Sequence, residues 1–131
     1  MSGELKLLQE ALERPETFYH VTREENLPNI KKKGLIPKIG ELSKMLGEKK
    51  KVVYLFDSQK STEDALLNWM GEEYENIEEE TGEEISLAIL EITLPKDFNV
   101  TPTFKQDNES FEWTTSETIN PKYIKVWKTG Q

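Results

Sequence analysis

The sequence predicts an α+β fold in a single domain, and three observations lead to that prediction. Helical spacings of apolar residues occur early in the chain, strand-like apolar runs are separated by turn residues, and the last third reads mostly as strands. The chain has 131 residues, of which 35% are hydrophobic and 32% charged, which suits one domain with its own core. No internal repeat or long linker divides it. We therefore expect one domain over residues 1–131, with residues 1–15 forming an N-terminal helix.

The first third of the chain alternates helices and strands. Apolar residues at helical spacing predict a helix over Leu5–Leu12, and the aromatic and β-branched run Thr17–Thr22 predicts a strand. Thr22 and Glu25 have the spacing of a capping box, which predicts that a helix begins after Thr22. Gly34 predicts the end of that helix.

The rest of the chain contains one more helix and several strands. The continuous apolar run Val52–Phe56 predicts a buried strand. Ser61 or Thr62 is expected to cap a helix that reaches about Ile77, with its end marked by Gly82. Apolar residues on the inner face of this helix are Ala65, Leu66 and Trp69. The other expected elements are a helical turn over Leu42–Leu46, strands over Ile85–Leu94, Phe98–Phe104, Glu109–Thr115 and Tyr123–Lys128, and a turn at Asn120-Pro121.

Composition excludes several kinds of site. The chain has no cysteine and one histidine, so disulfides, thiolate metal sites and zinc sites with two imidazoles are excluded. No apolar run is long enough to span a membrane, and the N-terminus lacks the pattern of a signal peptide. We therefore expect a cytoplasmic protein that uses no metal.

Charge is segregated along a chain whose net charge is −8. Lysines are concentrated from Lys31 to Lys51, whereas Glu72 to Glu84 contains acidic side chains and no basic one. Both runs fit a solvated surface. Alternatively, the lysines meet phosphate and the acids repel bulk polyanions. The overall acidity argues against a general nucleic-acid binder but leaves room for a locally basic cleft.

Three segments together resemble the ADP-ribosyltransferase superfamily, particularly the branch of the RNA 2'-phosphotransferases. The segments, which cover most of residues 17–127 in the family's order, are Phe18-Tyr19-His20-Val21-Thr22 with Lys33-Gly34-Leu35-Ile36-Pro37, then Val52-Val53-Tyr54-Leu55-Phe56, and finally Phe111-Glu112-Trp113-Thr114-Thr115 with Pro121-Lys122-Tyr123-Ile124. The resemblance implies two small packed antiparallel-rich sheets with flanking helices. It also implies NAD as the substrate.

The resemblance implies roles for four residues. His20 would hydrogen-bond the nicotinamide-side ribose, Tyr54 would stack on the nicotinamide, and Glu112 would contact a ribose hydroxyl. Thr22 would line the adenosine side of the cleft. These residue types suit the chemistry, because a carboxylate stabilises the cationic sugar that forms when nicotinamide leaves. Catalytic residues are therefore expected at His20, Tyr54 and Glu112, and NAD-binding residues at His20, Thr22 and Tyr54.

Simpler interpretations exist for each of these residues. His20 and Tyr54 could be packed strand residues, since aromatic side chains favour strands. Alternation along the strand places the Glu112 side chain opposite Trp113, on a face that could be either the cleft or solvent. Glu117 is the rival carboxylate, although its position suggests a loop. Trp113 and Trp127 are expected in the core. No phosphate-binding glycine loop and no nucleophile elbow is present.

The leading functional prediction is an NAD-dependent mono-ADP-ribosyltransferase that modifies an intracellular macromolecule, protein or nucleic acid. The alternative is a non-catalytic protein of the same fold that binds a nucleotide or a partner, which would suit a small phage or bacterial protein. RNA 2'-phosphotransferase activity is the third possibility. It is disfavoured because the basic positions expected to hold RNA phosphate are not evident and the chain begins shortly before the first strand.

Overall fold

The computed structural model describes residues 15–38, 51–103 and 112–130. Within these ranges the strands form one six-stranded antiparallel sheet in the order β4-β5-β2-β1-β3-β6. The strands are β1 (Thr17–Arg23), β2 (Val53–Phe56), β3 (Leu87–Thr93), β4 (Thr101–Thr103), β5 (Glu112–Thr115) and β6 (Ile124–Thr129). The helices are α2 (Leu27–Lys33), α4 (Gln59–Leu67) and α5 (Trp69–Thr81), and the 3-10 turns are η1 (Glu24–Asn26) and η2 (Pro121–Tyr123).

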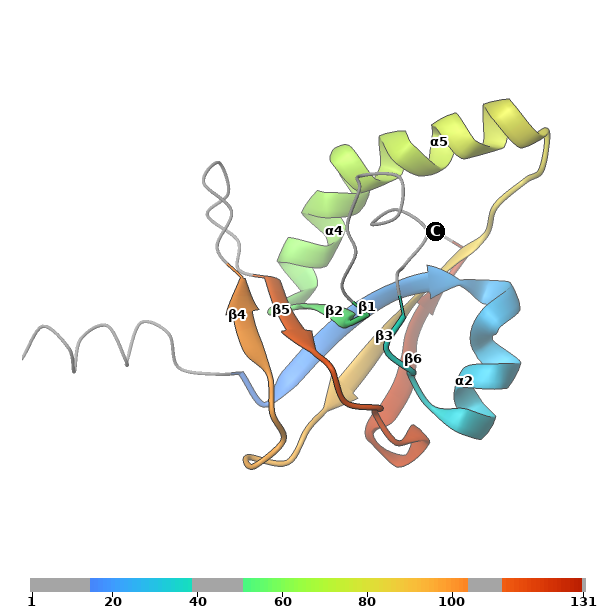
Figure 1. The fold of residues 1–131 in the computed structure, drawn as a ribbon. Helices are drawn as coiled ribbons and strands as arrows, with labels where there is room; N and C mark the ends of the chain where they lie inside the picture. Colours follow the sequence, from blue (N-terminus) through green and yellow to red (C-terminus); the bar gives the residue numbers. More distant parts are fainter. Residues whose placement is uncertain (1–14, 39–50, 104–111, 131) are drawn as a thin grey trace, which may run out of the picture.

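The α+β prediction is confirmed, but the division of the sheet differs from the expected one. The sequence predicted two small packed sheets, whereas the described strands belong to one open sheet (Figure 1). β1 pairs along its whole length with β3, and β2 pairs along its whole length with β5. Between β1 and β2, the only registered pair of described residues is Tyr19 with Phe56. This pair is what joins the two three-stranded halves into one sheet.

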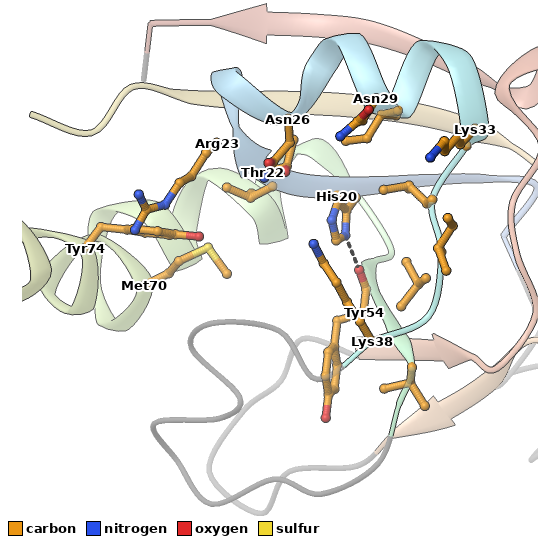
Figure 2. A pocket seen from close by; sticks show the side chains of 17 residues that line it. His20, Thr22, Arg23, Asn26, Asn29, Lys33, Lys38, Tyr54, Met70 and Tyr74 are labelled. Carbon is orange, nitrogen blue, oxygen red and sulfur yellow. Dashed lines mark hydrogen bonds between the residues drawn. The ribbon is translucent and has the colours of Figure 1, made fainter.

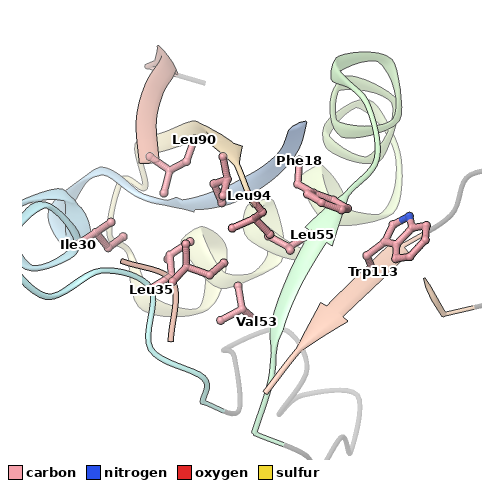
Figure 3. Close-up of a cluster of buried hydrophobic side chains, with 10 residues drawn as sticks. Phe18, Ile30, Leu35, Val53, Leu55, Leu90, Leu94 and Trp113 are labelled. Carbon is pink, nitrogen blue, oxygen red and sulfur yellow. The ribbon is translucent and has the colours of Figure 1, made fainter. Parts of the chain in front are cut away.

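Helices cover both faces of the sheet. Alternation along β1 directs Phe18 to the face that carries α2, and Tyr19 and Val21 to the face that carries α4 and α5. The α2 side holds the cluster drawn in Figure 3, in which Phe18 and Trp113 meet edge to face at 5.9 Å between ring centroids. On the other side, Trp127 packs against Tyr19 at 5.5 Å. The prediction that Trp113 belongs to the core is therefore confirmed, whereas Trp127 is partly buried and packs against the buried cluster on the α4 and α5 side.

Helix boundaries follow the predicted glycines but not the predicted caps. Gly34 ends α2 and Gly82 ends α5, both with positive φ. Thr22 does not cap a helix, because the chain first forms η1 and the Thr22 hydroxyl instead accepts a hydrogen bond from the Asn26 amide at 3.1 Å. The cap of α4 is Ser58, three residues before the expected Ser61.

The single helix predicted from Ser61 or Thr62 to about Ile77 is instead two helices, α4 and α5. They meet at Asn68, where the backbone leaves helical geometry (φ −119°, ψ −115°). The remaining strands begin or end within a few residues of their predicted bounds. Within the expected strand Phe98–Phe104, the described residues that form a strand are Thr101–Thr103. The expected helix Leu5–Leu12, the turn Leu42–Leu46 and residues 104–111 lie outside the described residues.

Candidate functional site

The candidate site lies where β1 and β2 separate. Beyond the Tyr19–Phe56 pair the two strands make no further registered pair, and the His20 ring lies at this opening. Its Nδ1 atom is 2.7 Å from the backbone carbonyl oxygen of Tyr54. A carbonyl oxygen only accepts, so Nδ1 carries the hydrogen and donates it. The ring thus links the two strands where their backbone pairing has ended, and its Nε2 atom keeps the other hydrogen-bonding position.

A cavity of about 440 Å³ occupies this opening (Figure 2). This volume falls within the range of small-molecule sites. Its walls come from β1, α2, the segment that follows α2, the start of β2, and α5, which contributes Met70 and Tyr74. Because α2 and α5 cover opposite faces of the sheet, the cavity is lined by elements from both sides of the sheet.

Local structure determines which side chains reach the cavity. Along β1, the period of two places His20 and Thr22 on one face, and both line the cavity. After α2, the positive φ of Gly34 turns the chain so that Leu35 forms a backbone bridge with Ile119. A second bridge, between Lys38 and Val52, then anchors the backbone of Lys38 beside β2.

Hydroxyl and amide groups line the cavity near the end of β1. Thr22 is buried, and its hydroxyl oxygen accepts the hydrogen bond from Asn26 described above. A hydroxyl that accepts one bond keeps its own hydrogen for donation, and the Asn26 amide keeps its carbonyl oxygen as an acceptor. Asn29 adds a second amide to the lining from α2. These groups can recognise sugar hydroxyls or base edges.

The charge of the lining contrasts with the charge of the chain. Arg23, Lys33 and Lys38 line the cavity, and no aspartate or glutamate does among the residues that the structure describes. The Arg23 guanidinium lies 3.8 Å from the carboxylate of Glu25, whose side chain is 72% exposed. A cation-lined cavity in a chain of net charge −8 creates a local positive potential that favours an anionic ligand.

The protonation of His20 follows from its surroundings. Burial lowers the pKa of the imidazole below its ordinary value of 6.5, and the nearby charge of Lys38 acts in the same direction. The hydrogen bond to the Tyr54 carbonyl opposes both effects. Figure 2 shows the Lys38 side chain extending toward the His20 ring. At neutral pH the ring is therefore uncharged, and Nε2 is a hydrogen-bond acceptor.

The structure brings three of the four predicted site residues together. His20, Thr22 and Tyr54 all line the cavity. However, His20 contacts the backbone of Tyr54, and the phenol ring points away from the imidazole (Figure 2). Sequence reasoning singled out the lysine-rich run as a possible phosphate-binding stretch, and two of its members, Lys33 and Lys38, line the cavity.

Glu112 lies elsewhere. It is at the start of β5, paired with Phe56 on one side and Thr103 on the other, and only 7% of its surface is exposed. It is therefore buried rather than facing solvent, but it is not part of the cavity lining. Glu117, the rival carboxylate, is exposed in the turn after β5, as its position in the sequence suggested.

Sequence reasoning did not single out several polar lining residues, among them Arg23, Asn26 and Tyr74. A signal existed for the first two, because Arg23 is the last residue of the His20 strand and Asn26 directly precedes α2. Tyr74 had none, since it belongs to a glutamate-rich helix far away in the sequence.

No family model, no curated protein and no solved structure matches this chain. Within residues 15–38, 51–103 and 112–130, no group of three or more acidic or imidazole side chains is arranged to hold a metal ion. None of the described helices has the length and apolar character needed to cross a membrane.

Proposed function

We propose that this chain binds NAD through its ADP-ribose portion in the cavity between β1, α2, β2 and α5. The observation that carries this proposal is the lining itself, which combines three cations, two asparagines, a buried hydroxyl and two tyrosines without any described carboxylate. Pyrophosphate needs cationic or N–H donors, ribose needs paired donors and acceptors, and a base needs a flat apolar or aromatic surface. The cavity contains all three kinds of group. We also propose that the chain has an ADP-ribosyltransferase-like fold, on the strength of the three motif segments.

In the proposed complex, the two ends of the cavity take different parts of the nucleotide. Tyr74 and Met70, with Arg23 extending toward Tyr74 in Figure 2, offer a surface for the adenine. Thr22 and Asn26 lie between that end and His20, within reach of sugar hydroxyls. The unprotonated Nε2 of His20 accepts a hydrogen bond from a ribose hydroxyl, which is the role that the family resemblance implies.

Calorimetric titration with NAD and with ADP-ribose tests the proposal. The wild-type chain should bind both, and His20→Asn should weaken binding at least about tenfold, because loss of a ligand hydrogen bond in a buried site is worth about 1.5 kcal/mol or more. Lys128→Met on β6 is the matched control, since Lys128 does not line the cavity, and its affinity should equal that of the wild type. If the wild-type chain binds neither nucleotide, the proposal is wrong.

ADP-ribosyl transfer is the second candidate function, favoured by the convergence of His20, Thr22 and Tyr54 on one cavity. In that reaction the nicotinamide–ribose bond breaks with its electron pair leaving on nicotinamide, and an acceptor nucleophile attacks the cationic sugar and loses its proton. The position of Glu112 outside the lining favours binding without turnover instead.

Nicotinamide release measured over time in the presence of NAD separates the two functions. If the chain is a transferase that uses Glu112, the rate should fall at least about a hundredfold in Glu112→Gln, the effect typical of losing a general acid–base group, and stay unchanged in the exposed control Glu117→Gln. Release that survives Glu112→Gln removes this carboxylate from the mechanism. Tight NAD binding without release identifies a binding protein.

A further inference from the structure

The charges that line the cavity determine which nucleotide binds most tightly. This inference rests on the proposed function and concerns the charge at the end of the cavity that holds His20 and Tyr54. NAD carries negative charge on its two phosphates and a positive charge on its oxidised nicotinamide ring. ADP-ribose has the same phosphates and no nicotinamide, and NADH has a nicotinamide ring of nearly the same shape without the positive charge. The three molecules therefore differ in what they bring to this end.

Lys38 determines the electrostatic character of that end. Its backbone is held by the bridge with Val52, its side chain extends toward the His20 ring in Figure 2, and its charge is close enough to lower the pKa of that ring. Lys33 is a second cation in the lining of the same cavity. The His20 ring adds no positive charge of its own, because burial lowers its pKa and the ring is neutral at neutral pH.

No described group at this end offsets the lysine charge. The lining contains no aspartate or glutamate among the residues in the structure, and Glu112 lies outside it. A cationic nicotinamide placed against Tyr54 and His20 would therefore face a like charge, with no carboxylate of the described residues in the lining to offset it. Like charges at such short range oppose binding, and the opposition weakens as salt screens an exposed side chain such as that of Lys38.

We propose that the cavity discriminates by charge against oxidised NAD, and that its preferred ligands are ADP-ribose nucleotides without a positive charge at the nicotinamide end. Lys38 is the residue that determines this preference. It acts as a repulsive element against one form of the ligand, while the cations and amides of the lining attract the part that all forms share. On this basis the site retains the product of nicotinamide removal more tightly than the starting dinucleotide.

The test compares NAD, NADH and ADP-ribose by calorimetry on the wild-type chain at low ionic strength. NADH and ADP-ribose should each bind at least about tenfold more tightly than NAD. In Lys38→Met the ratio between NADH and NAD affinities should fall several-fold. Lys32→Met is the matched control, because Lys32 is an exposed lysine on α2 that does not line the cavity, and its ratio should equal that of the wild type. Raising the salt to about 1 M, where the Debye length is about 3 Å, should shrink the wild-type ratio.

The outcomes separate this inference from the proposed function. If NAD binds as tightly as NADH, the inference is wrong and the proposed function stands. An affinity ratio that Lys38→Met leaves unchanged also overturns the inference, because the selection then comes from another group. If none of the three nucleotides binds, the proposed function fails and the inference fails with it. Tighter binding of NADH and ADP-ribose than of NAD, with the preference reduced in Lys38→Met and kept in Lys32→Met, supports the inference.

Discussion

Replacement of Gly34 by alanine should destabilise the protein far more than the same replacement at Gly82. Both glycines follow a helix with positive φ, at +84° and +70°, and both donate their backbone N–H to the carbonyl four residues earlier at 2.8 Å. Alanine costs about 1–2 kcal/mol in the left-handed conformation of Gly82, and at least as much at Gly34, whose ψ of −170° lies outside that region. At Gly82 nothing lies within 4 Å of the added methyl group, so this strain is the whole expected effect.

At Gly34 a second penalty is added, because the new Cβ atom would lie 2.0 Å from the backbone oxygen of Ile119. Relief of this clash requires the Leu35–Ile119 bridge to move, and that bridge contains two backbone hydrogen bonds of 3.0 and 2.9 Å. Each is worth about 0.5–1.5 kcal/mol. We therefore expect Gly34→Ala to lower the free energy of unfolding by about 2–5 kcal/mol in total.

Equilibrium unfolding in urea, followed by tryptophan fluorescence, measures both variants under the same conditions. A difference of at least about 1 kcal/mol between Gly34→Ala and Gly82→Ala is expected, which is the lower end of the bridge contribution. Equal losses would show that the contact with Ile119 has no energetic consequence, and the reasoning would be refuted. Because Gly34 also lines the cavity, folded Gly34→Ala should bind the proposed nucleotides more weakly.

Three further measurements test other parts of the structure. The folded chain holds the pKa of His20 below 6.5, so below about pH 6.5 the unfolded chain binds more protons, and the free energy of unfolding should fall as the pH decreases. Urea unfolding at neutral pH and at about pH 5 should show a smaller fall for His20→Asn than for the wild type, and an equal fall would contradict this assignment. Ser58 accepts a hydrogen bond from the Ser61 backbone N–H at 3.0 Å, so Ser58→Ala should lower the free energy of unfolding in urea by about 1 kcal/mol. The control is Ser116→Ala at an exposed position, and an equal loss of stability in the two variants would argue against the cap. The Lys128 ammonium lies 2.9 Å from the Glu63 carboxylate, but both side chains are nearly half exposed, so Lys128→Met should reduce stability by less than about 1 kcal/mol, and a larger loss would mean that another interaction is involved.

The strands were the most predictable part of the fold, because their signal is local. Runs such as Thr17–Thr22 and Val52–Phe56 are apolar, β-branched or aromatic and lie between turn residues, and each contains a strand close to the predicted bounds. Helix starts were less predictable. Near α4, Ser58, Ser61 and Thr62 are all able to cap, and the choice depends on the extended backbone of Ser58 rather than on residue type.

The candidate site was predictable only where its residues belong to one segment. His20 and Thr22 share a strand face through a period of two, and both line the cavity. Glu112 shows the limit of that reasoning. Alternation gives the face of β5 on which its side chain lies, but not the register, and the register pairs Glu112 with Phe56, the β2 residue that pairs with Tyr19, rather than with Val53 or Tyr54 in the cavity lining. Tyr74 reaches the cavity through the packing of α5, which no local pattern encodes.

The junction between β1 and β2 also has a mechanical consequence. The two three-stranded halves of the sheet share the Tyr19–Phe56 pair and little other backbone pairing. We therefore expect the described sheet to bend most easily along this seam, where β1 and β2 meet. A ligand in the seam would brace one half against the other. Its arrival should therefore be visible as slower amide hydrogen exchange in β1 and β2, with much smaller changes in β6, which lies at the far edge.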